Sequence, residues 1–529
     1  MRVAVVGSGP SGVYTAQSLL QQDPEVRVDV LDRLPCPYGL VRYGVAPDHE
    51  KIKSLQHTLR TVLEEERVRF LGGVEVGAGG VPVARLRELY KAVVYCVGAA
   101  ADRRLGVPGE DLPGSWSATE FVSWYSAHPD AVADGFLRGV RSAVVVGVGN
   151  VAVDVTRILA RGSAELSATD MPQAALTALA ASRIDTVHMV GRRGPSQARF
   201  TTKELRELGS LPETEAVVEA AELALDPDAA DPSGLPSAQR RNVDVLRDWA
   251  ARPPGAARRR IRLRFFLRPV ELLARSCPQS PVVRPEGGPC GVRCVLSACR
   301  ADTRVLAVLG CSPGAAVGAP PARAKPSVGE RAGRRRAGGP PSGGGTLRTR
   351  PRDGRVGAVR FERTAPDGHG GATGTGRFEE IEAQLVLRSV GYRGVPLEGL
   401  PFDPARGTVP HRAGRVLRGV AVAPGEYVAG WIKRGPTGVI GTNRPCAKET
   451  VASLLADAPA LARREVPADP LPLLRAAGAE PVEWSGWLDI ERAEAALGAA
   501  LGRGGPVKLP DRAALREAVG GAGTGRRHD

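Results

Sequence analysis

Residues 3–20 read VAVVGSGPSGVYTAQSLL, a short apolar run followed by spaced glycines and a helical pattern. The spacing Gly7-x-Gly9-x-x-Gly12 is typical of the strand-to-helix turn of a dinucleotide-binding unit. Gly7 allows the tight turn, Gly9 lets the backbone approach a pyrophosphate, and Gly12 lets the helix pack closely on the strand. A second strand-like run ends 20 residues later at Asp32, whose carboxylate can accept hydrogen bonds from ribose hydroxyls. The sequence therefore predicts a dinucleotide site in a βαβ unit.

The pattern occurs a second time at residues 142–159, SAVVVGVGNVAVDVTRIL. Here the third position of the glycine motif is Ala152, a known variant of the same turn. We expect this loop to bind a second nucleotide through Gly147, Gly149 and Val151.

The next strand-like run, TVHMVG, ends at Arg192 and Arg193. A carboxylate at this place suits a free ribose 2′-hydroxyl, whereas guanidinium groups match the oxygens of a 2′-phosphate. The pair therefore favours NADPH over NADH. The alternative is a solvated strand end, since arginine is abundant in this chain.

Two sites of different character imply two nucleotides. The acid-ended site suits the adenosine of FAD or NAD, and the arginine-ended site suits NADPH. The natural combination is a flavoenzyme in which NADPH reduces FAD.

Five longer motifs resemble those of adrenodoxin-reductase-type ferredoxin–NADP reductases, the bacterial members more closely than the mitochondrial ones. They are PYGLVRYGVAPDH (37–49), GVGNVAVD (147–154), GRRGPSQARFTTKELREL (191–208), LRSVGYRGVP (387–396) and GWIKRGPTGVIGT (430–442). The resemblance extends over about residues 1–275 and from about 352 to the end.

This resemblance implies an α/β fold with two Rossmann-like domains, the NADPH domain being inserted in a discontinuous FAD domain. The expected boundaries are 1–105 and 389–529 for the FAD domain and 106–388 for the NADPH domain. In agreement, the apolar run AQLVLRSVG (383–391) resembles a strand that returns to the first sheet.

The resemblance also implies a set of contact residues. FAD would be contacted by Ser11, Asp32, Leu40, Val76, Trp431, Gly438, Val439 and Ile440. NADPH would be contacted by Gly149, Asn150, Arg192, Arg193, Glu204 and Gly438. His49 and Glu207 would lie near the reacting rings as proton-handling groups, although a structural histidine and a solvated glutamate are the simpler alternatives. Asp32 stands where the family often has glutamate, which shortens the reach of that carboxylate.

The implied activity is hydride transfer from NADPH to FAD, followed by release of single electrons to an acidic iron–sulfur ferredoxin that serves acceptors such as cytochromes P450. Arg240 and Arg241 begin a basic stretch that continues through residues 258–260 and resembles the ferredoxin-docking region of the family. No protein-bound metal is expected, because the flavin carries the redox chemistry.

Residues 430–442 support this interpretation without the resemblance. A Gly/Pro/Thr turn precedes a predicted amphipathic helix that includes CAKETVASLLAD (446–457). The positive N-terminal end of such a helix would stabilise negative charge on the reduced flavin. Trp431 could equally be a core aromatic residue.

Residues 276–351 do not belong to this pattern. They are rich in Pro, Gly, Arg and Ala, and they interrupt a hairpin-like passage, ELLARS…DGRVGAVRFERT. Their 12 Lys and Arg against 3 Asp and Glu supply nine of the fifteen net positive charges of the chain. We therefore interpret them as a disordered insertion or as sequence without an evolved role, and the net charge does not predict a nucleic-acid partner.

Three other classes of protein share some of these features. A flavin disulfide reductase needs two neighbouring cysteines, and Cys36 and Cys96 are isolated in the sequence. A flavin monooxygenase could have both glycine loops. A basic nucleic-acid-binding protein could retain an inactive reductase fold.

The sequence has neither a membrane-spanning apolar run nor a visible signal peptide. We expect a monomer in the cytoplasm, or in the mitochondrial matrix if the source is eukaryotic.

Overall fold

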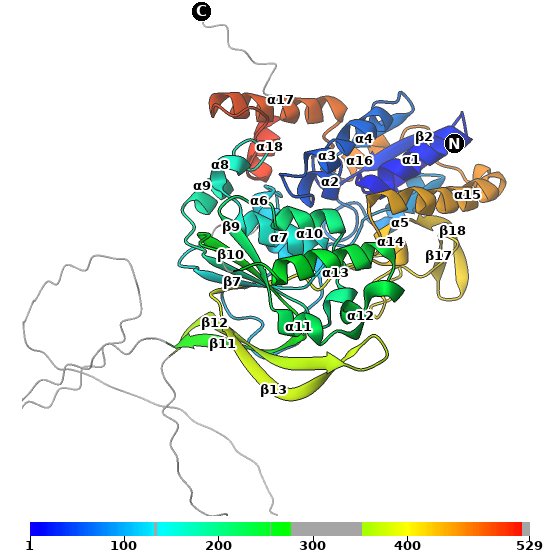
Figure 1. The fold of residues 1–529 in the computed structure, drawn as a ribbon. Coiled ribbons are helices and arrows are strands. Elements are labelled where there is room, and N and C mark those ends of the chain that lie inside the picture. The colour runs from blue at the N-terminus through cyan, green and yellow to red at the C-terminus, as the bar shows by residue number, and fades with distance from the viewer. Residues whose placement is uncertain (132–134, 254, 277–351, 521–529) are drawn as a thin grey trace, which may run out of the picture. The chain divides into compact units, whose positions relative to one another are not determined.

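The computed structural model describes residues 1–131, 135–253, 255–276 and 352–520. By its contacts the chain divides into a body, Met1–Arg275 with Gly354–Asp529, and the segment Ser276–Asp353. Nearly all of that segment, including the proposed insertion, lies outside the described residues. The body is built around two large sheets (Figure 1).

The first sheet is formed by both ends of the chain. In spatial order its strands are β16 (His411–Arg412), β17 (Arg415–Arg418), β18 (Ala421–Val428), β4 (Ala92–Tyr95), β1 (Arg2–Val6), β2 (Arg27–Leu31) and β3 (Val68–Leu71). The five strands from β18 to β3 are parallel, while β16 and β17 add an antiparallel edge.

Helices cover both faces of this sheet, because its parallel strands are apolar on both sides. Alternate residues of β1 show this: Val3 and Val5 belong to one core cluster, and Ala4 and Val6 belong to another. The main helices around it are α1 (Pro10–Gln22), α4 (Leu55–Leu63), α5 (Val83–Leu89), α15 (Asn443–Ala462), α16 (Leu471–Ala476) and α17 (Trp484–Ala500).

The second sheet is formed by the middle of the chain and is parallel throughout. Its spatial order is β6 (Ser115–Ser117), β14 (Leu385–Arg388), β7 (Ser142–Val146), β8 (Thr186–Val190), β10 (Arg259–Arg264) and β9 (Thr214–Val218). One core cluster includes residues of α6 (Ala118–Tyr125), α7 (Asn150–Ala160), α9 (Gln173–Ala180), α10 (Thr202–Leu208) and α13 (Ser237–Ala250).

A three-stranded sheet packs on the second sheet, and residues of both sheets form a separate core cluster there (Figure 1). Its strands are β11 (Leu267–Ser276), β12 (Arg352–Pro366) and β13 (Ala372–Glu382). Since β11 and β12 are neighbours in it, the two flanks of the proposed insertion pair with each other, as the hairpin-like passage predicted.

One strand prediction was wrong. The run 383–391 was expected to return to the first sheet, but it forms β14, which lies between β6 and β7 of the second sheet. An apolar run indicates a buried strand without indicating its sheet. Here β14 follows after only two residues from β13, whose sheet packs on the second sheet, and the strand that joins the first sheet is β18.

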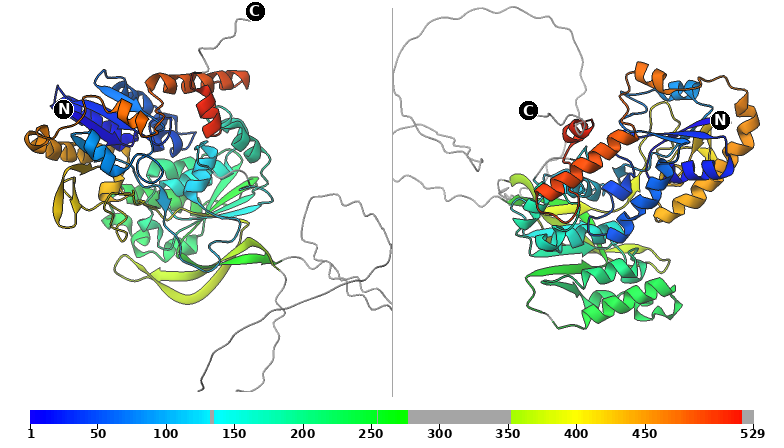
Figure 2. Two further views of the ribbon diagram at one scale, coloured as in Figure 1. Left: turned by 180° about the vertical axis from the view of Figure 1, so that it is seen from behind. Right: turned by 90° about the horizontal axis from the view of Figure 1, so that it is seen from above.

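The C-terminal part of the chain packs on the N-terminal part. Figure 2 shows α17 beside the N-terminal elements. Trp487 of this helix is buried against Tyr38, with ring centroids 5.9 Å apart. Glu494 accepts a hydrogen bond from the buried Arg42 at 2.6 Å. In the described part of the chain, no helix combines the length and apolarity that crossing a membrane requires.

Candidate active site

The first glycine loop has the geometry that the sequence predicts. Gly7 has φ +109°, a conformation that favours glycine. A Cβ at Gly12 would lie 1.8 Å from the Gly7 carbonyl oxygen, so any side chain there would clash with the turn. Gly9 precedes α1, and no side chain caps the start of this helix. The positive helix end and open N–H groups are therefore available to an anion.

Asp32 follows β2 at the same edge of the sheet. Its carboxylate accepts hydrogen bonds from Ser8 N at 2.8 Å, from Ser8 Oγ at 2.6 Å and from Leu34 N at 2.9 Å. These contacts fix the acid directly beside the glycine loop.

The predicted C-terminal contacts reach this edge because β18 runs parallel to β4, so the residues after both strands meet there. Gly430 lies against α1, since a Cβ at Gly430 would be 2.3 Å from Ser11 Oγ. Trp431 is half-buried, donates from Nε1 to the Thr437 carbonyl at 3.2 Å and stacks on Tyr392 at 5.4 Å.

The remaining predicted contacts of this site surround the same loops. A Cβ at Gly39 would lie 2.9 Å from the Gly9 Cα, which places Leu40 next to the loop. Val76 is buried, two residues after Val74, whose N–H bonds to the Asp32 carbonyl. Gly438 and Val439 are exposed, and Ile440 begins a short helix, η3 (Ile440–Thr442).

These residues fit an extended, partly apolar nucleotide such as FAD. The Ser11 hydroxyl is buried and has no hydrogen-bond partner among the described residues, so a polar group of a ligand would satisfy it. Leu40 and Val439 are 39% and 65% exposed at the edge of the site, although large apolar side chains are usually covered.

The second glycine loop is equally constrained. Gly147 has φ +141°, and a Cβ there would lie 2.2 Å from the Ser389 carbonyl oxygen. Gly149 precedes α7, and a Cβ there would meet no other part of the chain within 4 Å, which leaves open space over the helix start. Asn150 Oδ1 accepts a hydrogen bond from Thr201 N at 2.9 Å, and Val151 packs against the core.

The paired arginines lie at the same edge as this loop, because β8 is parallel to β7. Arg192 is exposed, and Arg193 is half-buried and donates to the Gly370 carbonyl at 3.3 Å. Burial and the charges of Arg192 and Arg199 lower the pKa of Arg193. Among the described residues none of the three arginines forms an ion pair. Arg199 was not among the predicted contacts, although it belongs to the 191–208 motif.

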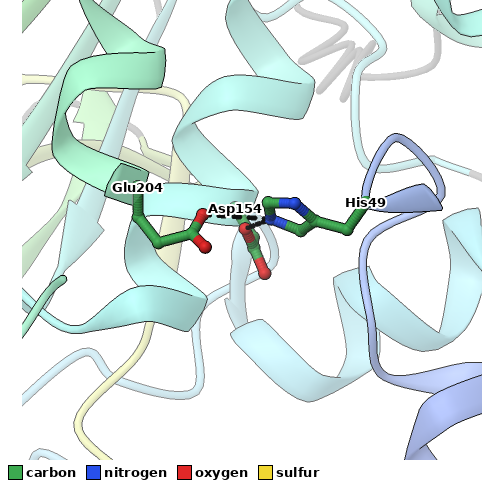
Figure 3. Close-up of side chains that lie close together, drawn as sticks. All are labelled: His49, Asp154 and Glu204. Carbon is green, nitrogen blue, oxygen red and sulfur yellow. Dashed lines mark hydrogen bonds and ion pairs between the residues drawn. The ribbon is translucent and has the colours of Figure 1, made fainter. Parts of the chain in front are cut away.

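A cluster of ionisable side chains links the two halves of the body (Figure 3). His49 Nε2 lies 2.8 Å from Asp154 Oδ1 and 3.0 Å from Glu204 Oε2. His49 precedes α3 (Glu50–Lys53), Asp154 is on α7 and Glu204 is on α10. The resemblance assigned Glu204 to NADPH, and the structure places it, buried, beside His49.

The buried Arg157 lies at the centre of this cluster. It makes a two-pronged ion pair with Asp48 at 2.7 and 2.9 Å, and Arg161 adds a bond to Asp48 at 2.7 Å. Its Nη2 also lies 2.9 Å from Asp154 Oδ1 and 2.7 Å from His49 Nε2. Sequence reasoning missed Asp48, Asp154 and Arg157, although the first two stand inside the motifs 37–49 and 147–154.

The arginine also decides how to interpret a possible metal site. One ligand atom each from His49, Asp154 and Glu204 lie within 4.8 Å of one another, close enough to hold an ion. The Arg157 guanidinium already contacts all three of these groups and supplies the positive charge. The geometry therefore favours an ion-pair network over a metal centre.

The network controls the ionisation of its members. Burial opposes the charge of His49, but hydrogen bonds to Asp154 and Glu204 outweigh it and raise the pKa of His49 to about 9. Burial likewise disfavours the charged form of Asp48, but Arg157 and Arg161 lower its pKa to about 2. The charge of Arg157 opposes protonation of His49, but the carboxylates outweigh it and favour the protonated form.

Glu207, the second predicted proton-handling residue, lies between this network and solvent. Its side chain is 31% exposed, and its Oε2 lies 4.0 Å from His49 Nδ1 and 3.4 Å from Arg157 Nη1. The distance to His49 is too long for a direct hydrogen bond, so a proton would pass through a bridging water or after a small movement.

The arginines predicted to contact ferredoxin lie on a helix at the surface. Arg240 and Arg241 are exposed on α13. The later part of the same basic stretch, residues 259–264, forms β10 of the second sheet. Arg260, Arg262 and Arg264 of this strand pair with carboxylates, whereas Arg259 donates to main-chain carbonyls.

The cysteines of the described residues do not form a redox pair. Cys36, Cys96 and Cys446 are all free and buried. Burial raises the pKa of Cys36 to about 11 and that of Cys96 to about 12, which disfavours the reactive thiolate. The disulfide-reductase alternative therefore has no support here.

Two sheets of mainly parallel strands, each with a nucleotide-type glycine loop, are the architecture of a dinucleotide-dependent oxidoreductase. In agreement, the family model described as pyridine nucleotide-disulphide oxidoreductase matches residues 1–206. NADPH-ferredoxin reductase FprA of Mycobacterium tuberculosis is 41% identical over 464 residues, which cover 86% of this chain and 83% of the relative. The mitochondrial NADPH:adrenodoxin oxidoreductase of Arabidopsis thaliana is 34% identical, with 94% and 91% covered.

Solved structures agree with the sequence relatives. Mycobacterium tuberculosis FprA in complex with NADPH matches with a TM-score of 0.76 at 37% identity, over 97% of this chain and 98% of that one. The chain belongs to the family of NADPH–ferredoxin reductases and mitochondrial NADPH:adrenodoxin oxidoreductases.

The raised pKa of His49 leads to a prediction about stability. The protonated form is favoured in the folded state, so this contribution is complete below pH 6.5, the ordinary pKa, and is lost as the pH rises through about 9. We expect His49→Gln to lower the thermal unfolding midpoint most at pH 6 and progressively less towards pH 10. A midpoint difference that does not change with pH would contradict the assignment.

Proposed function

We propose that this chain is an FAD-dependent NADPH–ferredoxin reductase, which oxidises NADPH and reduces an acidic iron–sulfur ferredoxin. One observation carries the proposal: the first glycine loop ends beside a fixed carboxylate, Asp32, and the second lies beside arginines that have no carboxylate partner in the described residues. This contrast suits a free ribose at the first site and a 2′-phosphate at the second. The names of the relatives support both nucleotide and acceptor.

The division of strands supports the proposed domains. Every strand of the first sheet comes from 1–105 or 389–529, the proposed FAD domain. Every strand of the second sheet comes from 106–388, the proposed NADPH domain. The two glycine loops then serve one nucleotide each.

When bound, FAD would supply the chemistry that converts a two-electron hydride donor into a source of single electrons. The loop amides and α1 hold the first nucleotide, and Trp431 with the residues up to Ile440 borders it. His49 keeps a proton beside the junction of the two domains, and Glu207 connects it to solvent. These roles explain why a catalytic histidine would be surrounded by carboxylates.

Arg240 and Arg241 are proposed as part of the ferredoxin-docking surface. Both are exposed on α13 and lack ion-pair partners among the described residues, unlike Arg260, Arg262 and Arg264 of β10. Free cations attract an acidic partner and mainly accelerate its association.

We place the activity in the cytoplasm, or in the mitochondrial matrix if the source is eukaryotic. The protein would act as a monomer, and the reduced ferredoxin would deliver electrons to acceptors such as cytochromes P450.

The decisive test is NADPH-driven cytochrome c reduction by the purified holoprotein, with and without ferredoxin and with NADH as the control. We expect strong dependence on ferredoxin and a clear preference for NADPH. Bound flavin with no dependence on ferredoxin would redirect the assignment to another acceptor, and a protein without flavin would refute it.

The role of His49 is tested by stopped-flow reduction of the bound flavin. We expect His49→Gln to slow reduction by NADPH by about 10²-fold, the lower range for a positioned proton donor, while FAD stays bound. Glu494→Gln, which alters a different buried ion pair, that of Glu494 with Arg42, controls for general loss of packing. Unchanged reduction kinetics in His49→Gln would exclude a catalytic role.

The docking surface is tested by reversing charge. We expect the double substitution Arg240→Glu/Arg241→Glu to raise the KM for ferredoxin by about tenfold or more at low salt, because rim charges act on association. Reduction of ferricyanide by NADPH should not change. Arg412→Glu, at an exposed position on β16 of the first sheet, is the matched control. An equal rise of the KM for ferredoxin in both variants would show that the net charge of the protein matters and that this surface does not.

A further inference from the structure

Arg199 belongs to a segment that is fastened to the second glycine loop. Its backbone N–H donates to the carbonyl of Val148, the residue between the two glycines, at 2.8 Å. Two residues later, Thr201 N donates to Asn150 Oδ1 at 2.9 Å. The chain at 199–201 therefore runs along the mouth of the loop, where a bound nucleotide would lie.

The turn that joins Arg193 to Arg199 is also fixed. Ser196 N donates to the buried Asp226 Oδ2 at 2.9 Å, and a Cβ at Gly194 would lie 2.1 Å from the same oxygen. A short helix, η1 (Pro195–Gln197), completes the turn. Because both ends and the middle are held, Arg199 and the arginine pair stay at one edge of the second sheet.

The charge of Arg199 is not neutralised within the described part of the chain. Its side chain is exposed and has no ion-pair partner there, whereas Arg260 and Arg262 of the neighbouring β10 pair with Glu215 and Glu219. The repulsion between Arg199 and Arg193 shows that their charges lie close enough to interact. Gathering like charges without a counter-ion costs free energy, which a bound anion would offset.

We propose that Arg199 is a third cation of the 2′-phosphate site and strengthens the preference of this chain for NADPH. The inference rests on the proposed NADPH function. A 2′-phosphate carries close to two negative charges and three acceptor oxygens. It can therefore accept hydrogen bonds from a third guanidinium group in addition to those of Arg192 and Arg193. The pyrophosphate, by contrast, is served by the loop amides and the start of α7.

The first experiment measures binding without turnover. Adenosine 2′,5′-bisphosphate and 5′-AMP would be titrated calorimetrically into the FAD-containing holoprotein and its variants. We expect Arg199→Gln to weaken the bisphosphate about tenfold, the loss of one charge-assisted contact, and to leave 5′-AMP unchanged. Arg412→Gln should alter neither ligand. Equal weakening of both ligands would place Arg199 at the pyrophosphate and overturn the proposal.

The second experiment measures the KM for NADPH and for NADH in ferricyanide reduction. Arg199→Gln should raise the KM for NADPH by the same factor, with kcat and the KM for NADH unchanged. Arg192→Ala separates the inference about Arg199 from the proposed 2′-phosphate site itself. If Arg192→Ala weakens binding of the bisphosphate while Arg199→Gln does not, only the inference about Arg199 fails. If neither variant weakens it, the proposed 2′-phosphate site fails as a whole.

Discussion

The junction of the two sheets depends on the ion pairs of one buried guanidinium group, that of Arg157. It bonds to Asp48 from the N-terminal segment and to Asp154 from its own helix, and it lies within 3.5 Å of Glu204. A buried charge is costly unless it is paired and hydrogen-bonded, so these carboxylates and the arginine require one another. Their arrangement fixes how the segment before α3 meets α7 and α10, and His49 is positioned as a result.

The chemistry of the site follows from the direction of the strands. In both sheets the glycine loops and the charged residues follow the carboxyl ends of parallel strands, which places them at one edge. The ionic network then lies between these edges, with contributions from both domains. Nucleotide recognition is therefore local to each βαβ unit, whereas proton handling depends on how the two units meet.

This difference explains what the sequence could and could not predict. Gly7 and Gly147 were identifiable because the conformation of their turns is determined within a few residues, and Asp32 and Arg192 follow at fixed spacing in the same units. The sheet to which residues 383–391 belong was not identifiable, because a buried apolar strand has the same pattern in either sheet.

Contacts between distant segments were the other omission. Asp48 and Arg157 are separated by 109 residues, and nothing in either local pattern indicates the pair. Arg199 was overlooked for a related reason: its proximity to the glycine loop depends on a turn held by Asp226, which comes from a later part of the chain.

The place of β18 in the first sheet has a consequence for biosynthesis. This strand pairs with β4, although 325 residues separate the end of β4 at Tyr95 from the start of β18 at Ala421. The ribosome adds roughly 10 residues per second, so β4 waits about half a minute for its neighbour. During that interval the second sheet, whose strands all precede residue 389, can form completely. The edge at β4 stays unpaired meanwhile, and an unpaired apolar edge favours association of the nascent chain with other chains.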